Sequence, residues 1–210
     1  MTISEIKREA KLITKENARN PIAAFFYIYL IPVLCTGAVV GSLTALISWQ
    51  KTIINFSFII PIIMGYFALW YAKYAINTIG GNSAIQESAP SQNNFWEYFP
   101  YIGLMSILML LNAVLSVNIA NIINIIILIL EIIFVPIPFV VVILNKENSA
   151  RIGLALGSKY FLRTLALQIR FIPLYFLIAI TFGIVGIFKY TYIQTTFAIY
   201  TLDLMKREDV

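Results

Sequence analysis

The sequence predicts an all-α fold, a polytopic bundle of transmembrane helices with amphipathic helices at its surface. Of the 210 residues, 60% are hydrophobic and 12% are charged, whereas an average soluble domain has about 45–50% apolar and about 25% charged residues. The apolar residues fall in runs near the roughly 20 residues that cross the bilayer hydrocarbon as a helix. Because backbone polar groups cannot stay unpaired in lipid, each run should be helical.

The apolar runs predict six spans joined by short polar links. They cover about residues 22–48, 53–79, 99–117, 120–144, 165–184 and 187–205. The links SWQKT and SVNIAN are so short that the spans on either side of each must be antiparallel hairpins. The first run exceeds the roughly 7–15 apolar residues of a signal peptide, so we expect it to remain as a span. Residues 21–210 are therefore predicted to form one transmembrane domain.

Residues 1–20 predict a cytoplasmic amphipathic helix. Thr2 and Glu5 have the spacing of a capping box, so the helix should begin there. At 100° per residue, one face is apolar and another is basic. The apolar residues are Ile3, Ile6, Ala10 and Ile13, and the basic residues are Lys7, Arg8, Lys11, Lys15 and Arg19. Such a helix can lie on the inner leaflet with its basic flank toward anionic lipid headgroups, or it can dock on the protein's own cytoplasmic loops.

A second amphipathic helix is predicted between spans four and five. In the segment ENSARIGLALGSKYFLRTLALQIR, the residues Lys159, Arg163 and Arg170 share one helical face. Most of the other residues are apolar, so this helix should be half sunk in the interface or packed against its neighbours. We expect Lys159 and Arg163 to join the basic residues at the lipid surface.

The distribution of basic residues predicts the orientation. Of the 15 basic residues, 12 lie before the first span, around the link between spans four and five, or after the last span. Basic residues are enriched in cytoplasmic loops, and these three regions fall on one side of a six-span chain. The N-terminus and the C-terminus are therefore both predicted to be cytoplasmic.

Several short motifs resemble those of a known family. The N-terminal SEIKREAKLI is followed, late in the chain, by the turn Asn145–Asn148 and a basic helix. The reversal Thr181-X-Gly183-Ile184 and the closing Phe197-X-X-Tyr200 come next. Together they resemble an uncharacterised family of bacterial integral membrane proteins, common in Gram-positive bacteria and catalogued only as a domain of unknown function. The resemblance implies a bundle in the bacterial cell membrane and brings no established catalytic residues. Lys189–Tyr190 stands where members usually carry Pro-Tyr.

One acid, Glu131, lies midway along the predicted fourth span. Asn124 is on nearly the same face, and Asn121 lies one turn before it. On a lipid-facing surface a central acid costs about 2.5–3.5 kcal/mol, so this polar stripe should face the bundle interior. The functional interpretation is an ion or proton site, or a polar contact in a substrate path. The structural interpretation is a protonated glutamate hydrogen-bonded to Asn112 or Ser116.

Other features bear on charge contacts and helix packing. Lys73, Arg170 and Asp203 fall at similar depth near the cytoplasmic ends of their spans, so we expect Asp203 to contact Arg170 or Lys73. Pro136 and Pro138 each remove a backbone donor, which predicts a kink beyond Glu131. Gly37 and Gly41 form a GxxxG motif, which permits close approach of a second helix.

The sequence argues against several classes of chemistry. It contains no histidine, which removes histidine-based zinc sites and Ser-His or Cys-His nucleophiles. The GSK at 157–159 lacks the frame of a phosphate-binding loop. The basic loops of a membrane protein account for the net charge of +5 without nucleic-acid binding. We therefore expect no enzyme activity, no catalytic residues, no metal and no cofactor.

Two classes of function remain. The first is a non-enzymatic accessory or scaffold protein of the cytoplasmic membrane, acting in envelope stress, secretion or tolerance to membrane-active peptides. The second is a small transporter or channel that uses the polar stripe around Glu131. The expected partners are the bilayer and its anionic headgroups, together with another membrane protein or a second copy of the chain. A hydrated cavity around Glu131 favours the transporter, and a dry packed seam favours the scaffold.

Overall fold

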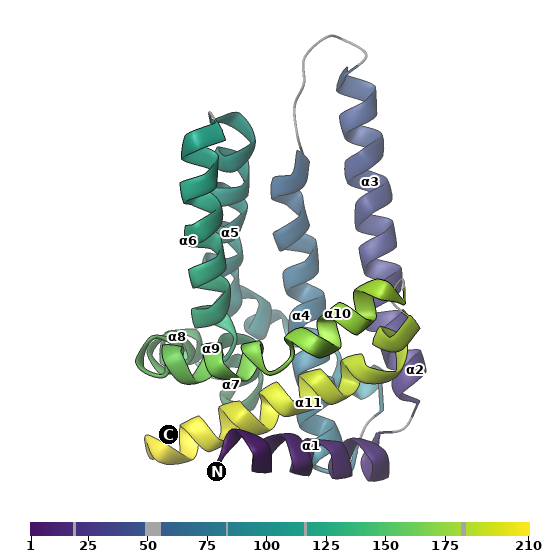
Figure 1. Cartoon of the computed structure of the whole chain (residues 1–210), viewed down its shortest axis with the longest axis vertical. Coiled ribbons are helices and arrows are strands. Elements are labelled where there is room, and N and C mark those ends of the chain that lie inside the picture. Colours follow the sequence, from purple (N-terminus) through teal and green to yellow (C-terminus); the bar gives the residue numbers. More distant parts are fainter. Residues whose placement is uncertain (19, 49–55, 83, 116, 182–183) are drawn as a thin grey trace.

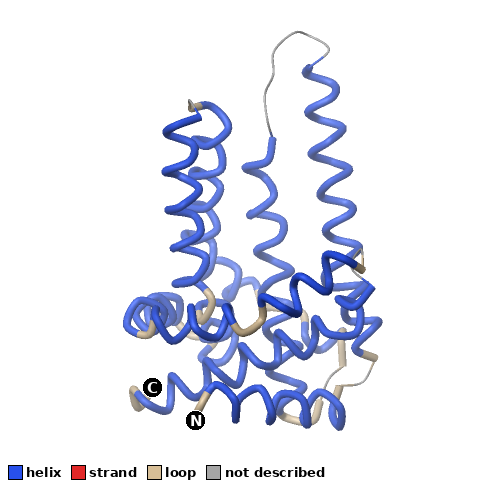
Figure 2. The backbone as a smooth tube through the Cα atoms, viewed as in Figure 1, coloured by secondary structure: helices blue, strands red, loops and turns tan. Residues whose placement is uncertain are grey.

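The computed structural model describes the chain except for residues 19, 49–55, 83, 116 and 182–183. Arg19, Ser116 and Gly183, each part of an expectation above, lie outside the described residues. Helices make up nearly all of the described chain, which contains no strand. Figure 2 shows these helices joined by short loops. The all-α class predicted from the sequence is confirmed for this part of the chain.

The helices follow one another with few residues between them. The first half contains α1 (Ile3–Asn17), α2 (Pro21–Ala24), the π-helical η1 (Phe25–Leu30), α3 (Ile31–Ser48), η2 (Phe56–Ile59), α4 (Ile60–Ile79) and η3 (Gln86–Ser88). The second half contains α5 (Gln92–Val114), α6 (Val117–Phe134), α7 (Ile137–Leu144), α8 (Ser149–Lys159), α9 (Phe161–Ile169), α10 (Ile172–Ile180) and α11 (Ile184–Arg207).

The helices form an upright group and a group that lies across it. In Figure 1, α3, α4, α5 and α6 stand side by side, whereas α1 and α11 run across their lower ends. Both chain termini lie at this lower end. The upright α4 is central, since it packs against α5, α7 and α11.

Three helices of the described chain are long and apolar enough to cross a membrane. They cover Pro21–Thr44, Gln92–Val114 and Asn118–Leu144, which match the first, third and fourth predicted spans. The pair α9 and α10, bent by 41°, makes a fourth candidate if it counts as one span, and it overlaps the predicted fifth span. α4 coincides with most of the predicted second span but is not among these candidates.

The expectation of a sixth span at 187–205 is not met by a helix parallel to the others. These residues lie in α11, which runs across the upright helices (Figure 1). The buried face of α11 is rich in polar residues, which pack against the rest of the protein. They are Thr191, Thr195, Thr196, Thr201 and Asp203. The apolar residues of this segment predict a span, but the prediction does not take account of polar side chains that are enclosed by the rest of the protein.

The predicted break after Glu131 is present. α6 ends at Phe134 and α7 begins at Ile137, with Pro136 between them. α8 packs tightly across this break through two glycines. A Cβ atom on Gly157 would lie 1.8 Å from the Ile133 carbonyl oxygen, and one on Gly153 would lie 2.7 Å from the Ile137 Cα. The close crossing therefore depends on glycine at both positions.

α1 packs against the protein itself. Its predicted capping box is confirmed: the Thr2 side chain accepts from the Glu5 amide, and the Glu5 carboxylate accepts from the Thr2 amide. Ile6 and Ala10 are fully buried in the core that includes α4 and α11 residues. Of the two placements expected for this helix, its apolar face therefore adopts the second, in which it docks on the protein itself.

The GxxxG motif of the first span makes no close contact within the described chain. A Cβ atom on Gly37 or Gly41 would meet nothing within 4 Å. The glycine that does bring two upright helices together is Gly65 of α4, where a Cβ would lie 2.3 Å from Ile102 of α5.

Candidate functional site

Glu131 lies on the wall of a cavity of about 340 Å³ formed where the upright helices meet α11. The walls come from η1, α4, α5, α6 and α7, and α11 supplies the rest. The lining residues are Ile28, Tyr29, Met64, Phe67, Ala68, Tyr71, Tyr98, Met105, Glu131, Phe134, Val135, Pro138, Phe139, Tyr190, Gln194 and Phe197. This volume lies at the lower end of the roughly 300–1,000 Å³ typical of small-molecule sites.

Each helix offers one face to the cavity. Residues three, four or seven positions apart lie on the same side of a helix. α11 uses Tyr190, Gln194 and Phe197, which have this spacing, and α6 with α7 uses Glu131, Phe134, Val135 and Pro138. α4 uses Met64, Phe67, Ala68 and Tyr71 in the same way. Glu131 and Pro138, seven residues apart, therefore lie on one wall on either side of the break at Pro136.

Three tyrosines form a connected aromatic cluster at this cavity. The ring centroids of Tyr29 and Tyr190 are 4.3 Å apart, and those of Tyr71 and Tyr190 are 4.8 Å apart at 83°. The Tyr71 hydroxyl shares a 2.8 Å hydrogen bond with the Thr191 hydroxyl. The cluster therefore joins η1, α4 and α11, and the hydrogen bond fixes the orientation of the Tyr71 ring.

Glu131 has an exposed side chain and makes no hydrogen bond or ion pair with any described residue. The two asparagines predicted to accompany it lie elsewhere. The Asn112 amide donates to the Asn124 side-chain oxygen at 3.1 Å and so joins α5 to α6, and Asn121 is exposed. The structure thus separates the predicted stripe into a carboxylate in the cavity and an amide pair, Asn112 with Asn124, nearer the end of α5 and the start of α6.

The expected contact of Asp203 with Arg170 or Lys73 is wrong, because all three residues have other partners. Asp203 Oδ2 accepts from Arg163 at 2.9 Å and from Arg207 at 3.1 Å, and its Oδ1 accepts from the Met1 amino group. Lys73 donates to the Ala89 carbonyl at 2.7 Å, and Arg170 donates to the Ser4 hydroxyl at 3.0 Å. Arg170, at the end of α9, thus contacts α1, and Arg163, about two turns earlier on α9, is the basic residue that reaches α11.

The environment of Asp203 shifts its ionisation. Burial alone would raise the pKa of this carboxyl, but the hydrogen bonds from the Met1 amino group, Arg207 and Arg163 together hold the pKa below its ordinary value. The carboxylate is therefore the charged centre of an ion-pair cluster between α9 and α11.

The described basic residues predicted for the lipid surface divide into an exposed set and a set that contacts the protein itself, the second set being Lys7 and Arg163, which pairs with Asp203. Arg8, Lys11, Lys15 and Lys159 are exposed. Lys7 lies 4.5 Å above the Phe171 ring and donates to the Arg170 carbonyl at 3.2 Å, and burial lowers its pKa. Contact of the exposed set with lipid headgroups stays a prediction.

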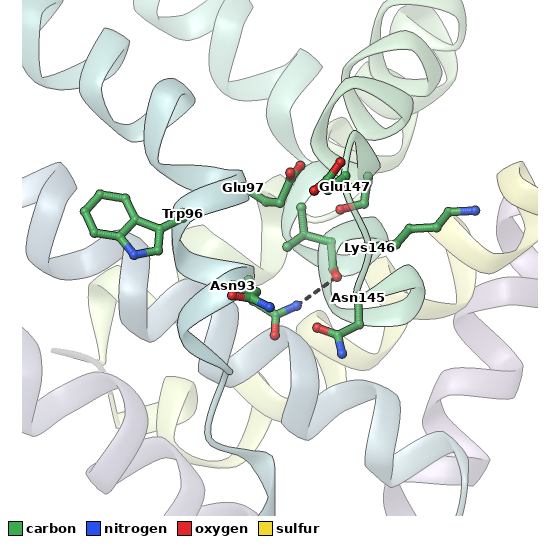
Figure 3. Close-up of a pocket in the computed structure, with 9 residues that line it drawn as sticks. Asn93, Trp96, Glu97, Asn145, Lys146 and Glu147 are labelled. Carbon is green, nitrogen blue, oxygen red and sulfur yellow. Dashed lines mark hydrogen bonds between the residues drawn. The ribbon is translucent and has the colours of Figure 1, made fainter.

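A second, polar pocket of about 300 Å³ lies between the start of α5 and the turn after α7 (Figure 3). Glu97 and Glu147 are directed to the same side of it, and Lys146 extends away from both. The Glu97 carboxylate accepts a 3.3 Å hydrogen bond from the backbone N–H of Asn148, the residue that precedes α8. Asn145 and Asn148 have φ of 46° and 65°, which asparagine tolerates better than most residues. These contacts dock the turn on α5.

Buried Asn94 completes this docking. It forms a capping box with Ser91 at the start of α5. Its amide also donates to the Val141 carbonyl of α7 at 2.9 Å. The polar pocket is therefore explained by helix capping and helix docking, and the Glu131 cavity is the stronger candidate for a functional site.

Glu131 is among the site residues predicted from the sequence, whereas the aromatic residues of the cavity are not. The usable signal was the spacing of Tyr190, Gln194 and Phe197, which places one polar and two aromatic residues on one face of α11. No family model, no curated protein and no solved structure matches the chain. The family resemblance therefore stays a prediction.

Proposed function

We propose that this protein is a small, non-enzymatic transporter of the cytoplasmic membrane that takes a solute into the Glu131 cavity. The observation that carries the proposal is a carboxylate on the wall of a 340 Å³ cavity with no hydrogen-bonding partner among the described residues. A carboxylate with only a structural role at this depth would be expected to hold a neighbouring helix. A carboxylate that faces open space is instead available to a ligand or a proton.

The surroundings of Glu131 support this function in a second way. The break between α6 and α7 lies one helical turn beyond the acid. Broken helices in transporters occur beside binding sites near the middle of the membrane, where the interrupted backbone can line a cavity. α11 passes across the same point and closes one side of the cavity with Tyr190, Gln194 and Phe197.

We propose that the chain crosses the membrane an even number of times. The upright segments α2–α3, α4, α5 and α6–α7 provide four, which leaves both termini on one side (Figure 1). That side carries the exposed basic residues of α1 and is therefore proposed to be cytoplasmic. The finer expectation of six spans requires α9–α10 and α11 to cross as well. The position of α11 across the upright helices favours four crossings with α11 near the cytoplasmic interface.

The accessory function stays the second candidate, and one surface favours it. α10 has no buried residue, and Ile172, Phe176 and Ile180 are exposed by 56%, 67% and 57%. The apolar face of α10 suits contact with lipid, with another membrane protein or with a second copy of the chain, and exposed Arg8 and Lys11 of α1 suit anionic headgroups. It does not explain why Glu131 faces a cavity.

Solute flux into proteoliposomes tests the proposal. The full-length chain is reconstituted in phosphatidylethanolamine and phosphatidylglycerol, and uptake of protons, hexyltrimethylammonium and hexanesulfonate is measured. At least one of them should enter faster than into protein-free vesicles, and Ala68→Trp should remove the difference by filling the cavity. Ala113→Trp, at an exposed alanine of α5 outside the cavity, should retain it. If no flux depends on the protein, the transport function is wrong.

A further inference from the structure

We infer that the Glu131 cavity binds a monovalent organic cation with an apolar body, such as a quaternary ammonium or a protonated amine. The inference rests on the proposed function, because it assigns a ligand class to the same cavity. Among the sixteen described residues that line the cavity, Glu131 is the one charged side chain. Lys73, which follows Tyr71 on α4, is instead bound to the Ala89 carbonyl. A ligand inside the cavity therefore meets one negative charge and no positive charge from its walls.

The ring cluster adds a second source of attraction for a cation. The face of an aromatic ring carries partial negative charge, and cations are stabilised over tyrosine rings within about 6 Å of the centroid. The Tyr29 and Tyr190 rings lie at 32° to each other, and the Tyr71 ring stands at 83° to Tyr190. All three tyrosines line the cavity, so a cation inside it lies beside several rings. Aromatic groups combined with a carboxylate are the usual recognition elements for ammonium ligands, because neither requires the ligand to donate hydrogen bonds.

The remaining walls define the rest of the ligand. Met64, Met105, Phe134 and Phe139 are apolar, and methionine adapts its shape to different ligands. A hydrated inorganic cation would gain little from such walls, because it prefers several oxygen ligands. A proton would need neither the volume of about 340 Å³ nor the rings. An anion would face Glu131 without a compensating cation. A single positive charge on a small apolar body fits all the lining groups together.

Equilibrium binding of two probes with the same tail and opposite charge tests the ligand class. The full-length protein in uncharged maltoside micelles is titrated with hexyltrimethylammonium and with hexanesulfonate by calorimetry. The cation should bind at least about tenfold more tightly, since opposite charges attract strongly in a partly desolvated site. Glu131→Gln should remove most of this preference, and Tyr190→Leu should weaken cation binding about three- to tenfold through loss of the ring face. Glu16→Gln, which removes an exposed acid of α1, should leave the preference unchanged.

The outcomes separate the ligand class from the transport function. Equal binding of both probes, or tighter binding of hexanesulfonate, would overturn the cation assignment. Cation binding that survives Glu131→Gln and Ala68→Trp unchanged would place the probe outside this cavity and would overturn the inference as well. Glu131-dependent cation binding without flux in proteoliposomes would support the site and contradict transport. Flux of protons or hexanesulfonate without cation binding would support transport and contradict the ligand class.

Discussion

The Arg163 guanidinium donates to Asp203 Oδ2 at 2.9 Å and thereby joins α9 to α11. Arg207, one turn after Asp203, donates to the same oxygen at 3.1 Å. Asp203 is only 9% exposed, so the cluster is partly shielded from water. Such shielding makes the ion pairs stronger than those on an open surface, and it makes the loss of one partner costly.

Asp203→Asn should destabilise the protein by about 2 kcal/mol, because a hydrogen bond to a charged group contributes roughly 1.5–3 kcal/mol. The variant keeps the shape of the side chain but leaves Arg163 beside a neutral group. Thermal unfolding in detergent, followed by circular dichroism, measures the change. Glu208→Gln is the control, because Glu208 pairs with exposed Lys159 at a more open site and should change the midpoint less. Equal midpoints for wild type and Asp203→Asn would contradict the structural role of the cluster.

The contribution of Asp203 should also depend on pH in a defined direction. The pKa of this carboxyl is lower in the folded protein than its ordinary value, which is near 3.9 in the unfolded chain. The ionised form is therefore stabilised by folding, and the stabilisation is complete above the unfolded pKa. It is lost as the pH falls through the lower, folded pKa. The difference in unfolding midpoint between wild type and Asp203→Asn should be constant near pH 7 and shrink below about pH 4. A difference that grows as the pH falls would reverse the sign and refute this account.

Gly157→Ala should be destabilising at the crossing of α8 over the α6–α7 break. A Cβ atom there would lie 1.8 Å from the Ile133 carbonyl oxygen, which is backbone and cannot rotate away. Forcing extra volume into a tight contact typically costs about 1–3 kcal/mol. Gly41→Ala is the matched control in an upright helix, since nothing lies within 4 Å of its Cβ position. It should be neutral or slightly stabilising because alanine favours helix. Thermal unfolding of both variants compares them, and a stable Gly157→Ala would show that α8 does not pack this closely.

Asn94→Ala should loosen the turn between α7 and α8. The substitution removes the capping partner of Ser91 and leaves the Val141 carbonyl without the donor that lies 2.9 Å away. Loss of a cap costs about 0.5–2 kcal/mol, and an unpaired buried acceptor adds to it. Amide hydrogen exchange should become faster in residues 141–149. Asn93→Ala, at the exposed neighbour, should leave the exchange rates near wild type. Unchanged protection in Asn94→Ala would argue against this docking role.

Local chemistry could be predicted from the sequence better than the arrangement of the helices. The capping box of Thr2 and Glu5 depends on residues three apart, and the structure contains it. The break at Pro136 follows from the missing backbone donor and is also present. The partner of Asp203 could not be predicted in this way, because Arg163 is 40 residues away in the sequence and the contact depends on how α9 packs on α11. The position of α11 was missed for a related reason. Its threonines look compatible with a span, and only the packed structure shows that Thr191 pairs with Tyr71.

The same distinction applies to the candidate site. An acid in the middle of an apolar run is visible in the sequence, which is why the sequence predicts Glu131 as a site residue. The ring cluster joins Tyr29, Tyr71 and Tyr190, which are far apart along the chain and meet only because α11 crosses the upright helices. No local pattern encodes that crossing.

Substitution of Glu131 distinguishes a ligand site from a structural hydrogen bond without any knowledge of the ligand. If the carboxyl held a neighbouring helix, Glu131→Leu would lose that contact and lower the unfolding midpoint. Within the described chain, however, Glu131 has no hydrogen-bonding partner and faces the cavity. Glu131→Leu should therefore leave the midpoint unchanged or raise it, because an apolar side chain is less costly than an acid within a membrane span. Flux or cation binding should be lost in the same variant. Glu131→Gln should likewise not lower the unfolding midpoint, since it conserves the shape of the side chain. It should also lose flux or cation binding if ionisation is required. A lower midpoint for Glu131→Leu with full activity in Glu131→Gln would instead establish the structural interpretation and remove the site.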